Sequence, residues 1–267
     1  MSGERRGAWM TLALVAVFPG AMALGRGRRL EPAAIPVRYA EGMVHGFLEL
    51  STEAGALLAH GDLLQVPRNG EIVSRMVFHL GSGSVFEESV TFTQRGEFTM
   101  QTYHLVQSGP AFADDIDASL SRSGSYVVKT KSHKNGEEHR YAGTLTLPSD
   151  VYNGMVAVIA KNISVRDITT VHIVAFTPEP HVIKLELVPS GSQRVLLGQH
   201  TETAVKFAIK PKLGALLLLG AKLTGKAPPD SHVWIITDDV PAFVRSEGPL
   251  YSGPVWRIAL TSPAWPR

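Results

Sequence analysis

Apolar and polar residues alternate in short runs along the chain from Met43 onward. The runs are rich in Val, Ile, Thr, Phe and Tyr, and Gly, Pro and Asn residues separate them. Such alternation, interrupted regularly by turn-forming residues, is typical of antiparallel strands that pack one face on a core. The pattern predicts strands at 44–52, 57–66, 71–80, 84–94, 97–107, 115–122, 125–133, 138–147, 168–176, 181–188, 192–197, 201–209, 231–237, 241–247 and 254–260.

Two segments interrupt the alternation. Met155–Asn162 follows Ser149 and Asp150, which are candidate N-caps, and this arrangement predicts a short helix. Leu213–Lys226 is strongly apolar, but its apolar run is much shorter than the ~20 residues that a membrane-spanning helix needs. No segment repeats at a fixed period, which argues against a propeller or a solenoid. The sequence therefore predicts an all-β protein, with a large curled antiparallel sheet or partial barrel and one or two short helices.

The clearest predicted turn is Asn135-Gly136, because this dipeptide favours a two-residue hairpin loop. That loop places Thr130 opposite Tyr141 and divides the hairpin into an apolar and a charged face. His133 and His139 then project from opposite faces, so we do not expect them to ligate one metal ion. The apolar face holds Tyr126, Val128, Tyr141 and Leu145, and the charged face holds Lys129, Lys131, His133, Glu138 and Arg140.

A second hairpin is predicted between 85–93 and 97–106, with a three-residue loop that ends at a left-handed Gly96. In that register Glu88 and His104 are diagonal neighbours on one face. A carboxylate beside an imidazole on an apolar surface can act as a general acid–base pair, so these two are the candidate catalytic residues. The apolar residues of this face that are candidates for ligand binding are Phe86, Phe92, Phe98 and Met100.

The N-terminus has the layout of an export signal. Arg5 and Arg6 precede an apolar stretch at 8–25, and Ala21-Met22-Ala23 fits the small-x-small pattern of signal peptidase sites. The arginines within 26–29 favour an alternative, an uncleaved anchor, because positive charge beyond an apolar stretch impedes translocation.

The domain organisation follows from these patterns. We expect a signal peptide at 1–23, with cleavage near Ala23, and a flexible lead-in at 24–42 that is charged and contains proline. The remainder, 43–267, is expected to form a single antiparallel β domain. The predicted location is the periplasm or the cell envelope.

Composition excludes several classes of protein. The chain has no cysteine, which rules out disulfides, Cys-ligated zinc, iron–sulfur clusters and a thiol nucleophile. It has 26 Lys and Arg against 24 Asp and Glu among 267 residues, and this balance provides no phosphate-binding surface for a nucleic-acid partner. The histidines form no HxH or HxxxH run, and the glycine motifs of nucleotide-binding loops are absent. We therefore expect no metal site and no cofactor.

Two segments, Leu147–Met155 and Pro241–Leu260, resemble uncharacterised exported bacterial all-β proteins that belong to no named family. The resemblance implies a cell-envelope setting and a large antiparallel sheet, and it implies no activity. In the second segment Arg245 and Glu247 share one strand face. This makes them candidates for ligand binding or for a cross-linked edge of the sheet.

A curled sheet with one apolar face forms a trough that suits elongated apolar ligands. The sequence therefore favours a non-enzymatic carrier or binding protein of the cell envelope, with a lipid-like ligand or an apolar partner segment. Leu217 and Leu218 are expected to close this trough or to contact a membrane surface, because exposed leucines are costly. Two alternatives stay open: a hydrolase that uses Glu88 and His104, and an outer-membrane β-barrel.

Overall fold

The structure, a computed structural model, describes residues 34–177, 179–197, 200–212, 231–238 and 240–261, which all belong to the unit Glu31–Arg267. The predicted signal peptide and the apolar segment 213–226 lie outside the described residues. The described part contains one helix, α1 (Val156–Asn162). Its strands are β1 (Val44–Thr52), β2 (Leu57–Arg68), β3 (Glu71–His79), β4 (Val85–Arg95), β5 (Glu97–Ser108), β6 (Asp114–Ser121), β7 (Ser125–Ser132), β8 (Glu138–Thr144), β9 (Thr169–Ala175), β10 (His181–Leu197), β11 (His200–Lys212), β12 (Ser231–Ile236), β13 (Ala242–Gly248) and β14 (Trp256–Thr261).

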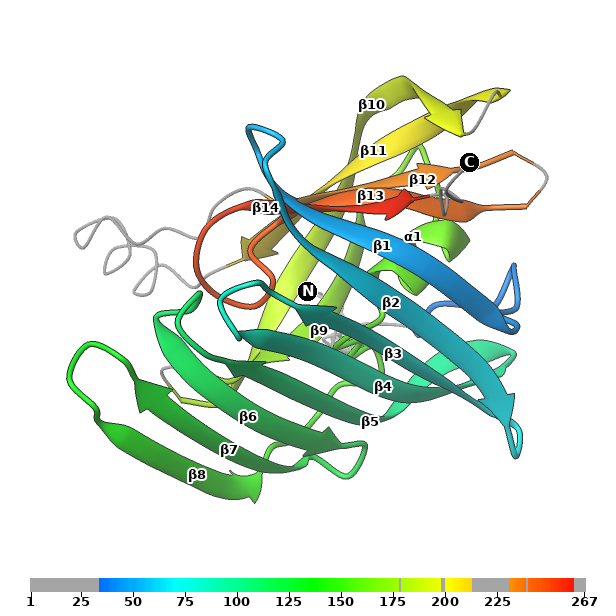
Figure 1. Ribbon diagram of the computed structural model, residues 1–267. Helices are drawn as coiled ribbons and strands as arrows, with labels where there is room; N and C mark the ends of the chain where they lie inside the picture. The colour runs from blue at the N-terminus through cyan, green and yellow to red at the C-terminus, as the bar shows by residue number, and fades with distance from the viewer. Residues whose placement is uncertain (1–33, 178, 198–199, 213–230, 239, 262–267) are drawn as a thin grey trace, which may run out of the picture. The chain divides into compact units, whose positions relative to one another are not determined.

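These strands form one sheet in the order β8-β7-β6-β5-β4-β3-β2-β1-β14-β13-β12-β11-β10-β9 (Figure 1). Every pairing between named strands is antiparallel. The first strand pairs with the last, so that Leu48 lies opposite Leu260. β8 and β9 are the two edges, and the described sheet is therefore open. The predicted fold class, an all-β protein with a large antiparallel sheet, is confirmed.

The strands follow the predicted alternation with one merger. The expected strands at 181–188 and 192–197 are a single strand, β10, whose pairing with β11 is irregular between Pro189 and Ser192. An irregularity of this kind lets a long strand bend without ending. The predicted helix exists as α1, but Met155 is its N-cap residue and no side chain caps it.

The register of the β7–β8 hairpin differs from the prediction. Thr130 lies opposite His139 instead of Tyr141, because the loop spans 133–136 and closes with Ser132 opposite Glu137. A shift by two residues leaves each side chain on its predicted face, since the side-chain period of a strand is two. His133 and His139 therefore lie on opposite faces, as predicted.

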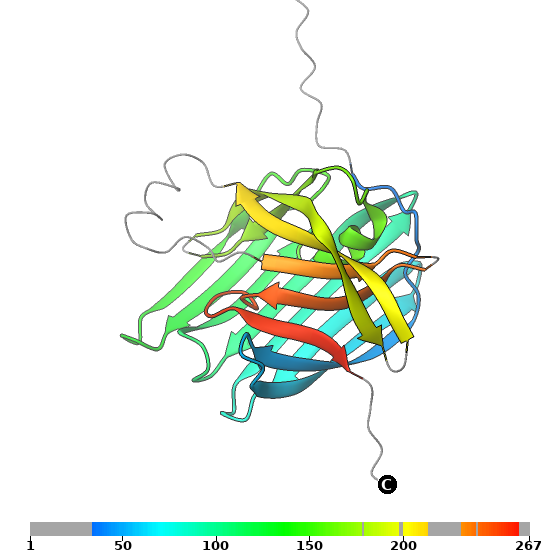
Figure 2. The same ribbon diagram turned by 90° about the horizontal axis from the view of Figure 1, so that it is seen from above.

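The sheet bends on itself, and α1 lies on its concave side (Figure 2). The inner, concave faces of its two halves, β1–β8 and β9–β14, line one cavity. On the inner face of the first half, Phe78 lies opposite Phe86 and Phe92 lies opposite Met100, and all four side chains are buried. Burial of each such side chain stabilises the fold by roughly 1.5–3 kcal/mol. Ile159 of α1 is also fully buried in this core.

The segment that follows β8 covers the edge of β9. The backbone of Tyr152 donates to His172 O, and His172 N donates to Asp150 O, so the segment pairs with β9 by a parallel bridge. The Asn153 amide continues this pairing, because it donates to Val174 O and accepts from Val174 N, each at 2.8 Å. An edge that is paired in this way offers no open ladder to another chain.

The Tyr152 side chain reaches from this segment to the first half of the sheet. Its hydroxyl accepts a hydrogen bond from Ile35 N at 2.8 Å and donates to Phe98 O at 3.2 Å. Burial is the main cause that raises the pKa of Tyr152 to about 12. The hydroxyl therefore stays protonated and can keep donating to Phe98 at all physiological pH values.

Residues 34–42 are held in place, which corrects the prediction that the lead-in is flexible up to residue 42. Val37 N donates to Gly96 O, and the Asn162 side-chain oxygen accepts from the backbone of Arg38 and Tyr39. The Gln94 side chain exchanges two hydrogen bonds with the backbone of Glu41. Composition alone could not indicate this order, because the partners are distant in sequence.

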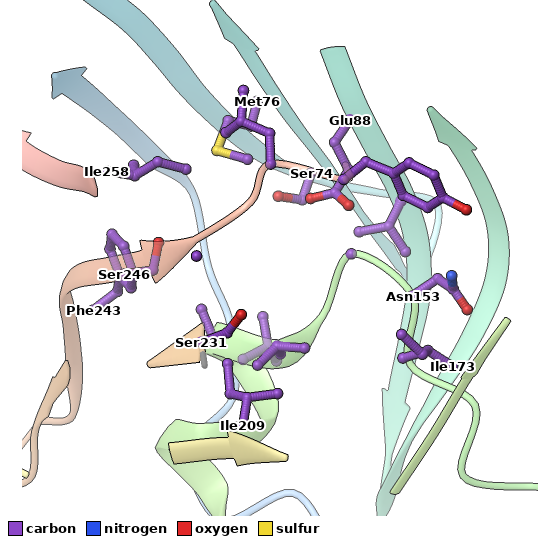
Figure 3. A pocket seen from close by; sticks show the side chains of 18 of the residues that line it. Ser74, Met76, Glu88, Asn153, Ile173, Ile209, Ser231, Phe243, Ser246 and Ile258 are labelled. Atoms are coloured by element: carbon purple, nitrogen blue, oxygen red, sulfur yellow. The ribbon is translucent and has the colours of Figure 1, made fainter. Parts of the chain in front are cut away.

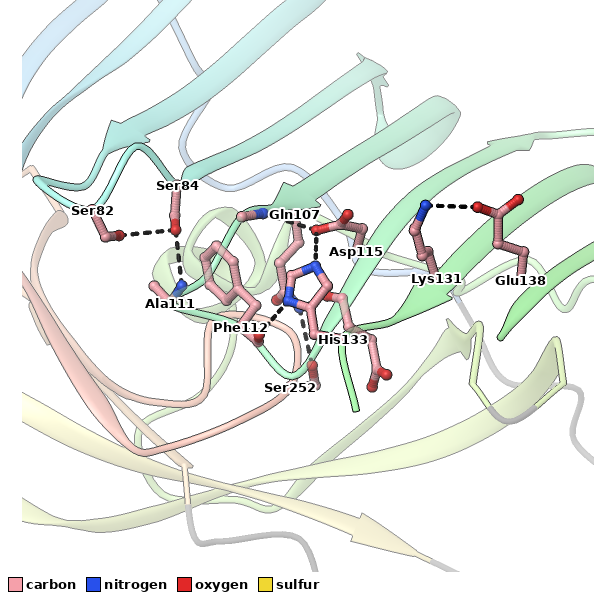
Figure 4. Close-up of polar contacts among 12 residues, drawn as sticks. Ser82, Ser84, Gln107, Ala111, Phe112, Asp115, Lys131, His133, Glu138 and Ser252 are labelled. Carbon is pink, nitrogen blue, oxygen red and sulfur yellow. Dashed lines mark hydrogen bonds and ion pairs between the residues drawn. The ribbon is translucent and has the colours of Figure 1, made fainter. Parts of the chain in front are cut away.

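The loop between β13 and β14 joins the two halves at the other end. Ser252 accepts a hydrogen bond from Gln107 Nε2 of β5 at 3.1 Å (Figure 4). Tyr251 accepts from Phe176 N at 2.7 Å and packs on the Phe176 ring. These contacts connect the loop between β13 and β14 to β5 and to Phe176, the residue that follows β9.

Candidate functional site

A cavity of about 1200 Å³ lies between the two halves of the sheet. Figure 3 shows side chains that approach it from all sides: Ser74, Met76 and Glu88 from β3 and β4, Ile173 and Asn153 from the β9 side, and Ile209, Ser231, Phe243, Ser246 and Ile258 from the C-terminal strands. Small-molecule pockets usually measure about 300–1,000 Å³, so this cavity has room for a large ligand.

Most of the cavity wall is apolar. The inner-face residues of both halves meet here, which explains why residues distant in sequence line the same space. Such walls favour hydrocarbon, since each buried CH₂ group contributes roughly 0.8 kcal/mol. The apolar lining residues include Leu48, Leu63, Met76, Val90, Val158, Ile173, Ile183, Leu185, Ile209, Phe243, Trp256, Ile258 and Leu260.

Glu88 is a carboxyl group on this apolar wall. Its cross-strand neighbours are Met76 on β3 and Leu105 on β5, and Tyr103 of β5 donates its hydroxyl to Glu88 Oε1 at 2.8 Å. Tyr103 is itself held by stacking on Phe176, with ring centroids 5.9 Å apart. Glu88 and Tyr103 both line the cavity, so a ligand there can touch them.

The surroundings of Glu88 and Tyr103 raise the pKa of both side chains. Burial raises the pKa of Glu88, and the hydrogen bond from Tyr103 opposes that rise without cancelling it. Burial also raises the pKa of Tyr103, and the neighbouring Glu88 carboxylate adds to the rise. Glu88 is therefore a carboxyl that holds its proton more tightly than a solvated one, in a cavity where a ligand can reach it.

The predicted contact between Glu88 and His104 is wrong. A bulge between Thr91 and Phe92 changes the β4–β5 register, so that His104 lies opposite Ser89 and points to the outer face. There its Nε2 atom contacts Asp117 Oδ1 at 3.0 Å. Since a shift by one residue reverses the faces of a strand, no acid–base pair forms between Glu88 and His104.

A second polar group lies near α1. Lys161 of α1 forms an ion pair with Glu41, and Gln65 Nε2 donates to the other oxygen of the Glu41 carboxylate at 2.9 Å. All three residues line the cavity. The two charges are largely buried but neutralise one another, which is the arrangement that makes buried charges tolerable.

The predicted apolar ligand-binding residues have a different place. Phe86, Phe92, Phe98 and Met100 lie on the inner face, as predicted, but are at most 1% exposed and do not line the cavity. They belong to one buried hydrophobic cluster that also includes Ile35, Tyr152 and Ile159. These four side chains therefore form the core that supports the cavity.

Arg245 projects to the outer face. Its guanidinium lies 4.0 Å from the ring centroid of Trp234 and donates to Gln193 Oε1 at 3.0 Å. Glu247 is among the cavity-lining residues and contacts Arg257 at 2.9 Å and Arg245 at 3.7 Å. Arg245 thus belongs to a cross-linked patch of the sheet, which was the alternative that the strand face suggested.

Several lining residues could not be identified from the sequence. Asn153, Gly154 and Tyr251 come from connecting segments, and their place in the cavity depends on long-range pairing. The remaining candidates, Leu217 and Leu218, lie outside the described residues.

In the part of the chain that the structure describes, no group of three His, Asp or Glu side chains is arranged to hold a metal ion. Over the same residues, no helix is long and apolar enough to cross a membrane.

Comparisons with known proteins found a similarity to a solved structure and no match in sequence. No protein-family model and no curated protein matches the chain. The chain is similar to the crystal structure of a β-barrel-like protein of the domain of unknown function DUF1849 from Brucella abortus. The similarity has a TM-score of 0.46 and 10% sequence identity, and it covers 84% of this chain and 98% of that one.

Proposed function

We propose that this protein binds or carries an apolar ligand inside the cavity between the two halves of its sheet. The cavity is the observation that supports the proposal most strongly. It has about 1200 Å³ of space, its walls are mostly apolar, and a few polar groups such as Glu88 and Lys161 converge on it. This combination is typical of sites for hydrophobic ligands that carry one polar group.

We also propose that the protein is exported and works in the cell envelope. The proposal rests on the basic start and small-x-small sequence of 1–23. Cell fractionation with N-terminal sequencing of the mature protein tests it, with a mature chain expected to begin near Leu24. A full-length chain in the cytoplasm would contradict it.

The hydrolase and the outer-membrane barrel do not fit the described arrangement of side chains and strands. The hydrolase required Glu88 and His104 side by side, and they lie on opposite faces of the sheet. A membrane-spanning barrel must pair all its strands in a closed ladder, whereas β8 and β9 end the sheet described here.

The binding proposal is tested with N-phenyl-1-naphthylamine, an uncharged fluorophore whose emission rises in apolar surroundings. We expect delipidated protein to take it up saturably. The double variant Ser74→Trp/Ser246→Trp, which adds bulk at two lining positions, should weaken binding severalfold.

The matched control is Ser89→Trp/Ser51→Trp. Both control positions lie on the outer face of strands in the same sheet, opposite Arg75 and Arg257 respectively. The control should bind the fluorophore as the natural protein does. Equal loss in both double variants, or no saturable uptake by the natural protein, would contradict binding in the cavity.

A further inference from the structure

Glu88 differs from the other acidic residues that line the cavity. Glu41 is paired with Lys161, and the Glu247 carboxylate, on the same strand face as Arg245, is paired with Arg257. Among the described residues, Glu88 has no cationic partner, and its one hydrogen bond comes from the neutral hydroxyl of Tyr103. Within the described part of the chain, Glu88 is therefore a cavity carboxyl whose negative charge no cationic side chain balances.

An unbalanced carboxyl in an apolar cavity disfavours its own ionisation, because little water or counter-charge stabilises the anion. A ligand that brings a positive charge removes this cost, while a neutral ligand leaves it unchanged. A negatively charged ligand would be repelled by the anion. The side chain thus gives the cavity a preference among ligands that have the same hydrocarbon chain.

We propose that the cavity selects amphiphiles with a protonated amine, and that the ammonium group pairs with the Glu88 carboxylate while the hydrocarbon chain lies along the apolar walls. This inference rests on the proposed function. It names the chemical class of the ligand and assigns Glu88 as the residue that determines specificity.

The positions of the neighbouring groups fit such a ligand. Tyr103 occupies one carboxylate oxygen of Glu88, and the other has no partner among the described residues. Ser74, on the adjacent strand, also faces the cavity and can accept from an ammonium group (Figure 3). The cavity's own cation, Lys161, contacts Glu41, so it does not occupy the place of the ligand's amine.

The test compares decylamine, decanol and decanoate, which share one chain length and carry a positive, a neutral and a negative head group at pH 7. Each displaces N-phenyl-1-naphthylamine from delipidated protein. In the natural protein we expect decylamine to bind at least about tenfold more tightly than decanol. Decanoate should bind more weakly than either.

Two variants test whether Glu88 causes the preference for the amine. Glu88→Gln keeps the shape of the side chain and an acceptor for Tyr103, and it should reduce the amine-to-alcohol ratio to about one. Glu87→Gln is the control, because Glu87 is the next residue of β4, faces outward and pairs with Arg75 at 2.7 Å. This control should keep the full preference.

The outcomes separate the inference from the proposed function. If all three compounds bind equally, or decanoate binds best, the inference is overturned and the carrier function stands. If Glu88→Gln keeps the amine preference, the assignment of Glu88 is overturned. If none of the compounds and no fluorophore binds, the proposed function itself fails.

Discussion

Tyr103 and Glu88 are joined by a 2.8 Å hydrogen bond between adjacent strands, on the face of the sheet that lines the cavity. The bond depends on the bulge between Thr91 and Phe92. If the register at the hairpin end, where Phe92 lies opposite Met100, continued along β4, Glu88 would lie opposite His104. The bulge instead brings Tyr103 to the inner face and leaves Glu88 in an apolar setting.

The raised pKa of Glu88 predicts a specific dependence of stability on pH. Because the folded state raises this pKa above the ordinary value of 4.5, the neutral carboxyl is favoured on folding. Its contribution to the free energy of unfolding is fully present below pH 4.5 and is lost as pH rises through the folded pKa. The Glu88→Gln variant has no ionisable group at this position, so its free energy of unfolding should not fall in this way as the pH rises.

The melting temperature of Glu88→Gln, relative to the natural protein, should therefore be higher at pH 8 than at pH 4. Thermal melts of both proteins at the two pH values measure the difference. A relative stability that is the same at pH 4 and pH 8 would show that Glu88 titrates as an ordinary surface carboxyl.

Tyr152→Phe should lower the free energy of unfolding by about 1–3 kcal/mol, because it leaves Ile35 N and Phe98 O without a partner in a buried site. Urea denaturation measures the change. Tyr39→Phe is the control, since the Tyr39 side chain lies on the surface at 41% exposure. Equal stabilities of the two variants would mean that the Tyr152 hydroxyl does not hold the N-terminal segment.

Gly154 and Gly136 provide a matched test of packing beside the cavity. Both have positive φ, at 70° and 72°, so an alanine at either costs about 1–2 kcal/mol in backbone energy. A Cβ atom at Gly154 would also lie 3.1 Å from the Tyr103 ring and 3.2 Å from Val90, whereas none of the described atoms lies within 4 Å at Gly136.

Gly154→Ala should therefore destabilise the protein by about 1–3 kcal/mol more than Gly136→Ala, which is the usual cost of overpacking. Denaturation of both variants in urea gives the comparison. Similar losses would indicate that the segment at Gly154 can move away from Tyr103 without cost.

His133 links the β7–β8 loop to β6 through contacts that favour a positively charged imidazole ring. Its Nε2 contacts Asp115 Oδ1 at 2.9 Å and its Nδ1 contacts Phe112 O at 3.0 Å, and both partners are acceptors (Figure 4). The ring can donate to both only when it is doubly protonated. The hydrogen bond to Asp115, more than any other interaction, raises the pKa of His133 above 6.5.

Asp115 responds in the opposite direction. Its burial alone would raise the pKa, but hydrogen bonds from Gly109 N and His133 outweigh burial and hold the pKa below 3.8. Stability from the pair should therefore be greatest between about pH 4 and 6.5. It should fall above that range as His133 loses its proton, and below it as Asp115 gains one.

NMR titration of the His133 ring measures this pKa directly, and Asp115→Asn should bring it down toward 6.5. An unchanged His133 pKa in that variant would contradict the pairing.

The strands and their faces could be predicted from the sequence, because alternate residues of a strand point to the same face and the buried face is therefore apolar at every second position. Phe86 and Val90, for example, alternate with polar residues and lie on the inner face, as their spacing predicts. The register of the hairpin that closes at 133–136 was predicted wrongly. The predicted face of each side chain is nevertheless correct, because the register is shifted by two residues.

The candidate site could be predicted only in part. Glu88 was identified as a polar residue on an apolar face. Its predicted partner was wrong because the extra residue of the bulge, Gln101 on β5, is neither Gly nor Pro and so does not mark the irregularity. Asn153 and Tyr251 were missed because their positions depend on hydrogen bonds to Val174 of β9 and to Phe176, the residue after β9. Such long-range contacts leave no local pattern in the sequence.

Native mass spectrometry of the delipidated protein mixed with decylamine tests binding in the cavity most directly. We expect a saturable adduct whose mass equals the protein plus bound ligand. The adduct should be strongly reduced in Ser74→Trp/Ser246→Trp and retained in Ser89→Trp/Ser51→Trp. A natural protein that stays free of ligand at every concentration, or an adduct that is equally abundant in both double variants, would contradict binding in the cavity.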